Sequence, residues 1–323
     1  MLDFSGPARL VAQHAPGTAF FRGLVRVLST TPVSLDPSKS LLAPGATAGY
    51  DVRDVSIPLG DHYTPGRMFT PRVATGASVI IAHGTTAEGA LPYYMWIRAM
   101  LEGGLTVLTF ELDGHGGNPR WLTCPAIEEN VPAAIAFLRD QPGIEPDRVG
   151  LLGVSLGGAC ALNAAAADKG VRAVVTVGSP YTLSIDEWGK LGEALGLFNP
   201  EIWPTYAEAT PDTLLAFMQN HLRVGPEIAE ETGDMLAPAT RAAVQAALKH
   251  LNPLDSVMAA GHAPLLVING EWDFISPPWQ AYDLYERAAG PKALAIVPRR
   301  NHFTIMISRT AVESTAAWFR RWL

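Results

Sequence analysis

The sequence predicts an α/β fold with a mostly parallel central sheet flanked by helices. After the first 50 residues, short apolar runs alternate with segments of helical pattern, and glycine and proline residues separate the two. Most of these runs are apolar along their whole length, as in strands that are buried on both faces. Strands that alternate with helices form parallel sheets covered by their crossover helices. With 323 residues, 48% hydrophobic and 17% charged, the chain is long enough for one large domain of this class or two smaller ones.

The first part of the chain precedes this alternation. Residues 8–28 carry apolar side chains at helical spacing, which predicts a helix packed against the domain, although the same pattern suits a membrane surface. Residues 29–50 are rich in proline, serine and glycine and are interpreted as a connector. The N-terminus carries an acidic residue and no apolar run follows it, so no signal peptide is expected.

The strands and helices of the predicted core follow in order. Apolar or alternating runs predict strands at residues 52–59, 67–70, 78–82, 105–111, 148–153, 171–178, 264–270 and 293–298. Helical patterns lie between them at residues 93–102, 127–139, 156–168, 279–289 and 309–322. The first two strands are joined by a predicted turn at residues 60–66, so we expect them to form an antiparallel edge.

Residues 181–255 interrupt this alternation with a segment that is helical in composition, divided by prolines and rich in large apolar residues. The segment leaves the core after one strand and returns before the next, at the edge of the sheet where open α/β folds bind ligands. We therefore predict a helical cap over an apolar pocket, with Trp188, Trp203 and Phe217 as candidate substrate-binding residues. The alternative is a helical subdomain whose aromatic side chains only pack against one another. The predicted domains are thus an N-terminal helix and connector (1–50), a core (51–180 and 256–323) and this insertion.

Composition narrows the classes of function. A net charge of −7 argues against a nucleic-acid partner, because phosphate binding needs a basic surface. No apolar stretch reaches transmembrane length, so stable membrane insertion is not expected. Cys124 and Cys160 are far apart in the sequence, which indicates neither a zinc site nor a disulfide framework and fits a cytoplasmic protein. Cys160 is expected to be a buried thiol in a helix of small residues.

The segment Gly153-Val154-Ser155-Leu156-Gly157 has the form G-x-S-x-G. It follows an apolar run and precedes a helix of small residues, which is the strand–turn–helix context of a nucleophile elbow. Such a turn strains the backbone of the serine, and side chains at the two flanking glycines would collide with neighbouring backbone. A glycine-rich turn can produce the same pattern, but the surrounding strand and helix favour the elbow. A serine hydroxyl is a poor nucleophile until a base takes its proton, so partners are required.

With this motif in this context, residues 50–323 resemble the α/β-hydrolase family, and residues 181–255 match its variable cap. The resemblance implies a catalytic triad in the chain order serine, acid, histidine. Asp273 lies three residues beyond the glycine that ends a late strand, where the family commonly has its acid. Glu271 is the rival and is interpreted as a solvated loop residue. Asp255 precedes that strand and is interpreted as a turn or cap residue.

His302 occupies the position that the resemblance implies for the base. It follows the last predicted strand and precedes the final helix. Histidine suits a general base because its unperturbed pKa lies near neutrality. Asp273 would orient the imidazole and stabilise the imidazolium that forms when Ser155 gives up its proton.

The resemblance also places the oxyanion hole. The strand at residues 78–82 ends in a His-Gly pair, and the expected donors are the backbone N–H groups of Leu156 and Thr85. Thr86 is the alternative donor, or a substrate contact, if the loop is shifted by one residue. The family often has further glycines after the His-Gly pair where this chain has threonines, which leaves the second donor open. His83 is interpreted as structural, with its ring hydrogen-bonded to nearby loops.

Asp113 and His115 follow the next strand in a D-x-x-G turn that is frequent at this place in the family. They resemble a second acid/base pair. We interpret them instead as part of a turn that fixes the wall of the pocket, with His115 as a candidate substrate contact.

These residues imply a serine hydrolase that cleaves a carboxylic ester with a small or medium, fairly apolar acyl group through an acyl-enzyme, without cofactor or metal. A serine at the elbow argues against the dehalogenases and epoxide hydrolases of this fold, which use aspartate there. An amidase, a thioesterase, a carbon–carbon hydrolase and an acyltransferase use the same triad and stay open. So does a non-catalytic binding protein on the same scaffold. The oligomeric state, monomer or homodimer, is also open.

Overall fold

The computed structural model describes residues 49–85, 91–122, 127–181, 250–273 and 276–323, together with residues 246 and 248. The predicted N-terminal helix lies outside the described residues, as do most of the predicted connector and most of the predicted cap. So do Cys124, Thr86, Trp188, Trp203 and Phe217. The boundaries predicted for the cap therefore stay a prediction.

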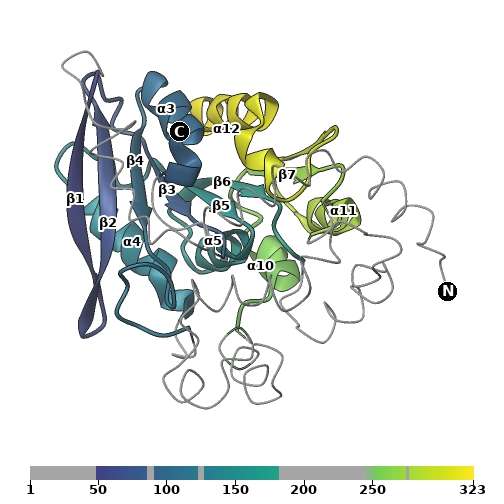
Figure 1. Ribbon diagram of the computed structural model, residues 1–323, viewed down its shortest axis with the longest axis horizontal. Coiled ribbons are helices and arrows are strands. Elements are labelled where there is room, and N and C mark those ends of the chain that lie inside the picture. Colours follow the sequence, from purple (N-terminus) through teal and green to yellow (C-terminus); the bar gives the residue numbers. More distant parts are fainter. Residues whose placement is uncertain are drawn as a thin grey trace, which may run out of the picture.

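An eight-stranded, mostly parallel sheet forms the centre of the molecule, in the order β1-β2-β4-β3-β5-β6-β7-β8 (Figure 1). β1 pairs antiparallel with β2, and β2 pairs antiparallel with β4. All the other pairs are parallel, as the alternation of strands and helices predicts. The strands are β1 (Tyr50–Leu59), β2 (His62–Pro71), β3 (Ser78–Ala82), β4 (Thr106–Phe110), β5 (Val149–Val154), β6 (Val171–Val177), β7 (Leu265–Gly270) and β8 (Lys292–Val297).

The second strand is longer than its sequence pattern indicates. The predicted turn at residues 60–66 is wrong, because β1 and β2 pair without a break as far as Leu59 and His62 and only two residues remain for the turn. Pro65 and Gly66 disguise the strand, since both residue types are usually depleted in strands. Gly66 is required here: a Cβ at this position would lie 2.8 Å from the carbonyl oxygen of Thr109 on β4.

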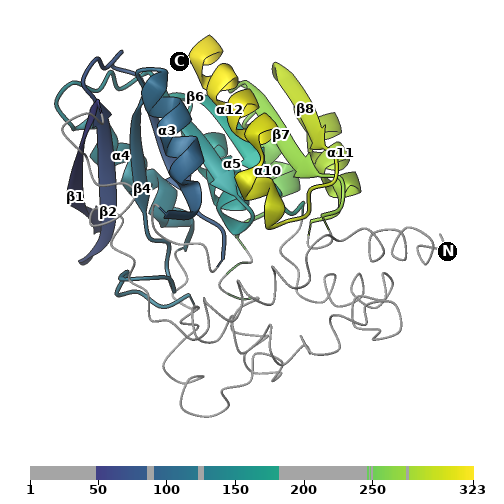
Figure 2. The same cartoon turned by 45° about the horizontal axis from the view of Figure 1, so that its top comes forward.

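Helices cover both faces of the sheet. One core cluster joins the sheet to α4 (Asn130–Arg139), α5 (Leu156–Ala167), α10 (Pro253–Ala259) and α11 (Pro278–Arg287). The other joins it to α3 (Tyr94–Glu102) and α12 (Arg309–Trp322). Figure 2 shows α3 and α12 side by side across one face, with the other helices behind the sheet. Short 3₁₀ turns precede α3, α4 and α12 at Leu91–Tyr93, Ile127–Glu129 and Thr304–Ile307.

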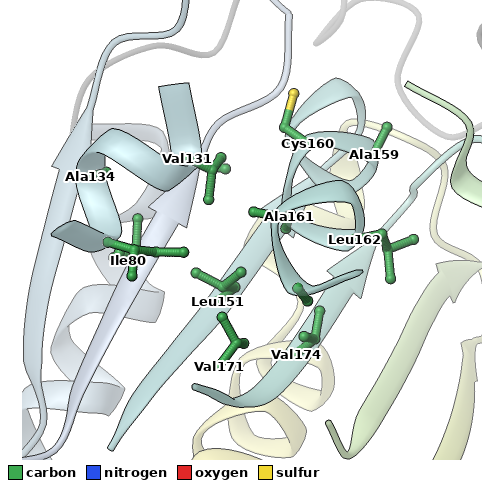
Figure 3. Close-up of a cluster of buried hydrophobic side chains, with 14 of the residues drawn as sticks. Ile80, Val131, Ala134, Leu151, Ala159, Cys160, Ala161, Leu162, Val171 and Val174 are labelled. Atoms are coloured by element: carbon green, nitrogen blue, oxygen red, sulfur yellow. The ribbon is translucent and has the colours of Figure 1, made fainter. Parts of the chain in front are cut away.

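The two faces of the sheet follow from the alternation of side chains along each strand. In β3, Ile80 belongs to the cluster under α4 and α5, whereas Val79 and Ile81 belong to the cluster under α3 and α12. Figure 3 shows Ile80, Leu151 and Val174 pointing toward the helical layer. Cys160 lies in that layer on α5 and is buried, as expected, and burial raises the pKa of its thiol to about 12.

The chain re-enters the core before β7. Leu248 and Leu251 are buried in the cluster that contains α5. Asn252 then caps α10 by accepting a hydrogen bond from the backbone N–H of Asp255. Asp255 thus lies in a capped first helical turn, in line with its interpretation as a turn or cap residue. In the part of the chain that the structure describes, no helix is long and apolar enough to span a bilayer.

Candidate active site

Ser155 lies between the end of β5 and the start of α5 in a backbone conformation with φ 50° and ψ −121°. Among the described non-glycine residues, only Ser155 and Arg299 have a positive φ. A Cβ at Gly153 would lie 2.4 Å from the carbonyl oxygen of Gly157, and a Cβ at Gly157 would lie 2.1 Å from that of Ala82. The two glycines are therefore required by close backbone approach, and the elbow geometry is the one expected from the G-x-S-x-G pattern.

Serine is a favoured N-cap, but the hydroxyl of Ser155 does not cap α5. Its Oγ lies 3.0 Å from Nε2 of His302. Nδ1 of the same imidazole lies 2.9 Å from Oδ2 of Asp273. A carboxylate only accepts hydrogen bonds, so Nδ1 carries the proton and Nε2 is left to accept from the serine. The structure thus brings Ser155, His302 and Asp273 into one continuous line of hydrogen bonds.

Asp273 is held from both sides. Its side chain is buried, Oδ2 contacts His302, and Oδ1 accepts a hydrogen bond of 2.8 Å from the backbone N–H of Ser276. The rival acid, Glu271, is exposed, and its carboxylate accepts a hydrogen bond from the backbone N–H of Arg299. Of the two acidic residues, Asp273 is the one that contacts His302, whereas Glu271 contacts the backbone of Arg299.

The three side chains meet because β5, β7 and β8 are parallel and end at the same edge of the sheet. β6 lies between β5 and β7 and is directly followed by Gly178, which has φ 56°. A Cβ at Gly178 would lie 3.2 Å from both Oδ2 of Asp273 and Nδ1 of His302. The missing side chain at Gly178 therefore leaves room for the imidazole and the carboxylate to meet.

The loop after β3 lies directly against the elbow. A Cβ at Gly84 would lie 3.1 Å from Cβ of Ser155 and 3.3 Å from the carbonyl oxygen of Val154. Leu156 is the first residue of α5, where a backbone N–H has no acceptor within the helix. The N–H groups of Leu156 and Thr85 thus belong to the two segments that border Ser155. Thr86 is outside the described residues.

His83 is a buried structural residue, as expected. Its Nε2 accepts a hydrogen bond of 2.9 Å from the backbone N–H of Leu112, and its Nδ1 lies 2.8 Å from the carbonyl oxygen of Gly84. Nδ1 is therefore the protonated nitrogen. Burial, with a further contribution from His115, lowers the pKa of His83 to about 3, so the ring is neutral across the physiological range.

Asp113 and His115 lie in a buried polar turn. His115 is fully buried, with its Nδ1 at 2.9 Å from the carbonyl oxygen of Asp113 and its ring edge-to-face with His83 at 4.8 Å between centroids. Asp113 accepts a hydrogen bond from Asn118 and pairs with Arg120 at 3.4 Å. Burial raises the pKa of Asp113. These contacts fit the turn-fixing interpretation, whereas the complete burial of His115 gives its predicted contact with substrate no support.

Three contributors to this geometry were not singled out from the sequence. Tyr93 accepts a hydrogen bond from the backbone N–H of Gly84, Ser276 donates to Asp273, and Gly178 makes room for the acid and the base. Gly178 had a recognisable signal, since it directly follows a buried strand. Tyr93 and Ser276 had none, because each acts through one contact that only folding creates. The described residues contain no group of histidine, cysteine, aspartate and glutamate side chains suited to a metal ion.

A model of the alpha/beta hydrolase family matches residues 79–315, which include Ser155, Asp273 and His302. The chain belongs to the alpha/beta hydrolase family. The match also agrees with the mostly parallel sheet flanked by helices.

Curated relatives of this alpha/beta hydrolase include a thiohydrolase and a polyketide transferase. It is 26% identical over 266 residues to the thiohydrolase aneE of Aspergillus aculeatus, covering 75% of this chain and 83% of the relative. It is 27% identical over 280 residues to the polyketide transferase claH of Penicillium crustosum, covering 75% and 87%.

Solved structures share the fold at lower identity. A hypothetical protein of Pseudomonas aeruginosa superposes with a TM-score of 0.60 at 21% identity, covering 87% of this chain and 96% of that one. An esterase of Pyrococcus furiosus superposes with a TM-score of 0.59 at 19% identity, covering 86% and 93%.

Proposed function

We propose that this protein is a serine hydrolase that cleaves a carboxylic ester through an acyl-enzyme. The observation that carries the proposal is the line of hydrogen bonds from Asp273 through His302 to Ser155. A serine hydroxyl becomes an effective nucleophile when a positioned base takes its proton and a third group orients that base. Ser155, His302 and Asp273 lie in the order that a nucleophile, a base and an orienting group require, and this arrangement supports the proposal.

In the proposed reaction, Ser155 Oγ attacks the carbonyl carbon while its proton moves to Nε2 of His302. The buried carboxylate of Asp273 stabilises the resulting imidazolium. The N–H groups of Leu156 and Thr85 bind the oxygen that becomes negatively charged. His302 then protonates the leaving alcohol, the acyl group stays on Ser155, and a water molecule activated by His302 releases the acid.

Which bond Ser155 attacks is a separate question. Two relatives favour a thioester substrate or transfer of the acyl group. They are named as a thiohydrolase and a polyketide transferase. A thioester presents the same carbonyl to Ser155 with a thiolate as its leaving group, and an alcohol or amine can replace water at the acyl-enzyme. Thioester cleavage and acyl transfer are therefore the alternatives to ester hydrolysis. The predicted pocket residues Trp188, Trp203 and Phe217 favour an apolar acyl group.

The variant Ser155→Ala tests the proposal. It is expected to lower kcat for p-nitrophenyl acetate and butyrate by at least about 10⁴-fold, because removal of the nucleophile removes the covalent route. Labelling by a fluorophosphonate probe should be lost as well. Ser56→Ala, at an exposed position on the edge strand β1, is the matched control and should keep wild-type kinetics. Wild-type turnover by a folded Ser155→Ala protein would refute the assignment.

A substrate panel separates the candidates that share this site. Matched p-nitrophenyl esters, N-acetylcysteamine thioesters and anilides of one acyl group are compared by kcat/KM, which reports differential binding of the transition state. Added alcohol or amine tests transfer, because an acyl acceptor diverts product from the free acid. We expect the ester to be cleaved to free acid. A thioester preferred by more than about tenfold, or a transfer product in excess of acid, would replace ester hydrolysis by the corresponding alternative.

A further inference from the structure

Gly84 lies at the point where the loop after β3 meets the nucleophile, and side chains hold both of its backbone polar groups. Its N–H donates to the hydroxyl of Tyr93 at 3.0 Å. Its carbonyl oxygen accepts from Nδ1 of His83 at 2.8 Å. Tyr93 and His83 are both buried, with exposures of 0% and 1%. Since β3 ends at Ala82, this residue has left the sheet, and the two side chains take the place of strand hydrogen bonds.

The hydrogen bond to His83 determines which way the next N–H points. The described residues contain no cis peptide bond, so the C=O of Gly84 and the N–H of Thr85 point in opposite directions. The imidazole is itself bound to Leu112 in the loop after β4, and β3 lies between β4 and β5 in the sheet. The Gly84 carbonyl is therefore directed at the His83 ring, and the N–H of Thr85 points away from that ring.

We propose that His83 and Tyr93 are positioning residues for the oxyanion hole, acting together as a clamp on Gly84 that keeps the Thr85 N–H directed at the reacting carbonyl. This inference rests on the proposed function and deepens it. Rotation of the Gly84–Thr85 peptide would present a carbonyl oxygen to the developing negative charge in place of a donor. The clamp opposes that rotation because it would break the hydrogen bond to His83. Tyr93 holds Gly84 at its backbone N–H.

Neither side chain of the clamp takes part in proton transfer. His83 uses Nε2 to accept from Leu112 and Nδ1 to donate to Gly84, so both nitrogens are occupied. The Tyr93 hydroxyl lies against a backbone N–H rather than against Ser155 or His302. Removing the clamp should therefore weaken stabilisation of the transition state and leave ground-state binding of substrate nearly unchanged.

Two amide substitutions at His83 separate the clamp from a purely structural role. The side-chain nitrogen of asparagine can take the place of Nδ1, so His83→Asn keeps a donor for Gly84 and loses the acceptor for Leu112. Glutamine places its amide oxygen near Nε2, so His83→Gln keeps the acceptor for Leu112 and loses the donor for Gly84. We expect kcat to fall about 10- to 100-fold in His83→Gln, with KM within about twofold of wild type, and to be largely retained in His83→Asn.

Tyr93→Phe is the independent second variant, because it removes only the hydroxyl and keeps the buried ring. It should lower kcat about tenfold or more with little change in KM. It should also lower affinity for a trifluoromethyl ketone, which forms an oxyanion on the serine, by a similar factor. The matched control is Tyr94→Phe, at the first residue of α3, which should behave as wild type.

The outcomes separate this inference from the proposed function. If Ser155→Ala is inactive while Tyr93→Phe keeps wild-type kcat and ketone affinity, the clamp is wrong and the serine hydrolase stands. A greater loss of kcat in His83→Asn than in His83→Gln would also overturn the clamp, since it would place the role of His83 at Leu112. If either His83 variant fails to fold, judged by near-ultraviolet circular dichroism, Tyr93→Phe alone decides. If Ser155→Ala remains active, the proposed function fails first.

Discussion

The geometry around His302 depends on a single missing atom, the Cβ that Gly178 lacks. Its positive φ of 56° is uncommon for residues with a side chain, and its missing Cβ leaves the space that Asp273 and His302 share. A methyl group there would contact both at 3.2 Å, which is tighter than ordinary van der Waals distance. The hydrogen bond between acid and base therefore depends on a residue that takes no part in proton transfer.

Gly178→Ala is expected to lower kcat for p-nitrophenyl esters by roughly 10²-fold while the protein stays folded, because a shift of His302 by about 1 Å costs that much in a positioned reaction. Steady-state kinetics together with the rate of fluorophosphonate labelling measure the effect. The control is Gly143→Ala, which shares a positive φ but has open space around it, so it carries backbone strain alone. Equal kinetics in the two variants would show that crowding at Gly178 does not matter.

At the scale of elements, the position of Ser155 depends on how closely α5 packs against β3. α5 consists almost entirely of small residues, and its first turn lies against the carbonyl oxygens of Ala82 and His83. A longer side chain at Gly157 would meet both oxygens, at 2.1 and 2.4 Å. Backbone oxygens at the end of a buried strand cannot move aside as a flexible side chain can.

We therefore expect Gly157→Ala to displace α5, to destabilise the protein by about 2–4 kcal/mol and to abolish the proposed esterase activity. Urea unfolding measures the first effect and p-nitrophenyl ester hydrolysis the second. Ala167→Gly, at the exposed last residue of the same helix, should cost about 1 kcal/mol or less and keep activity. A Gly157→Ala protein with wild-type stability would contradict the close packing of α5 on β3.

At the scale of the whole molecule, an ion pair joins α4 to the end of α5, two helices that are separated along the chain. Arg139, the last residue of α4, contacts Asp168 at the end of α5 with Nη1 to Oδ2 at 2.6 Å and Nη2 to Oδ1 at 3.4 Å. Burial alone would raise the pKa of Asp168, but the guanidinium and the N–H of Gly170 outweigh burial and lower it. A carboxyl group whose pKa is lowered by folding stabilises the folded state when it is ionised.

The contribution of Asp168 should therefore depend on pH in a defined direction. It is complete above the pKa of the unfolded chain, near 4 for aspartate, and is lost as the pH falls through the lower pKa of the folded state. We expect Asp168→Asn to reduce the free energy of unfolding by only about 0.5–1 kcal/mol at pH 7, because the pair is partly exposed. The substitution should have little effect near pH 2.5. Urea titrations at both pH values measure this. Asp51→Asn, exposed on β1, is the control, and a pH-independent difference at Asp168 would contradict the linkage.

Most of the fold could be predicted from local pattern because the buried strands are nearly continuous in apolar residues. β3 was predicted with its observed bounds, and α12 likewise. β2 was predicted too short because proline and glycine mask a strand whose pairing is decided by its neighbours β1 and β4. Local pattern reports which side chains are buried, whereas pairing between strands is a property of the assembled sheet.

For the candidate site, the elbow motif and the resemblance to the α/β-hydrolase family indicate Ser155, Asp273 and His302 from the sequence alone. Parallel strands bring their carboxyl ends to one edge, so three residues that follow three such strands are expected to be neighbours. The contact of Asp273 with His302 and the two hydrogen bonds that Tyr93 and His83 make with Gly84 could not be predicted in this way. Each depends on hydrogen bonds between segments that are far apart in the sequence or that turn away from the strands, and such contacts form only when the sheet and both helical layers close around them.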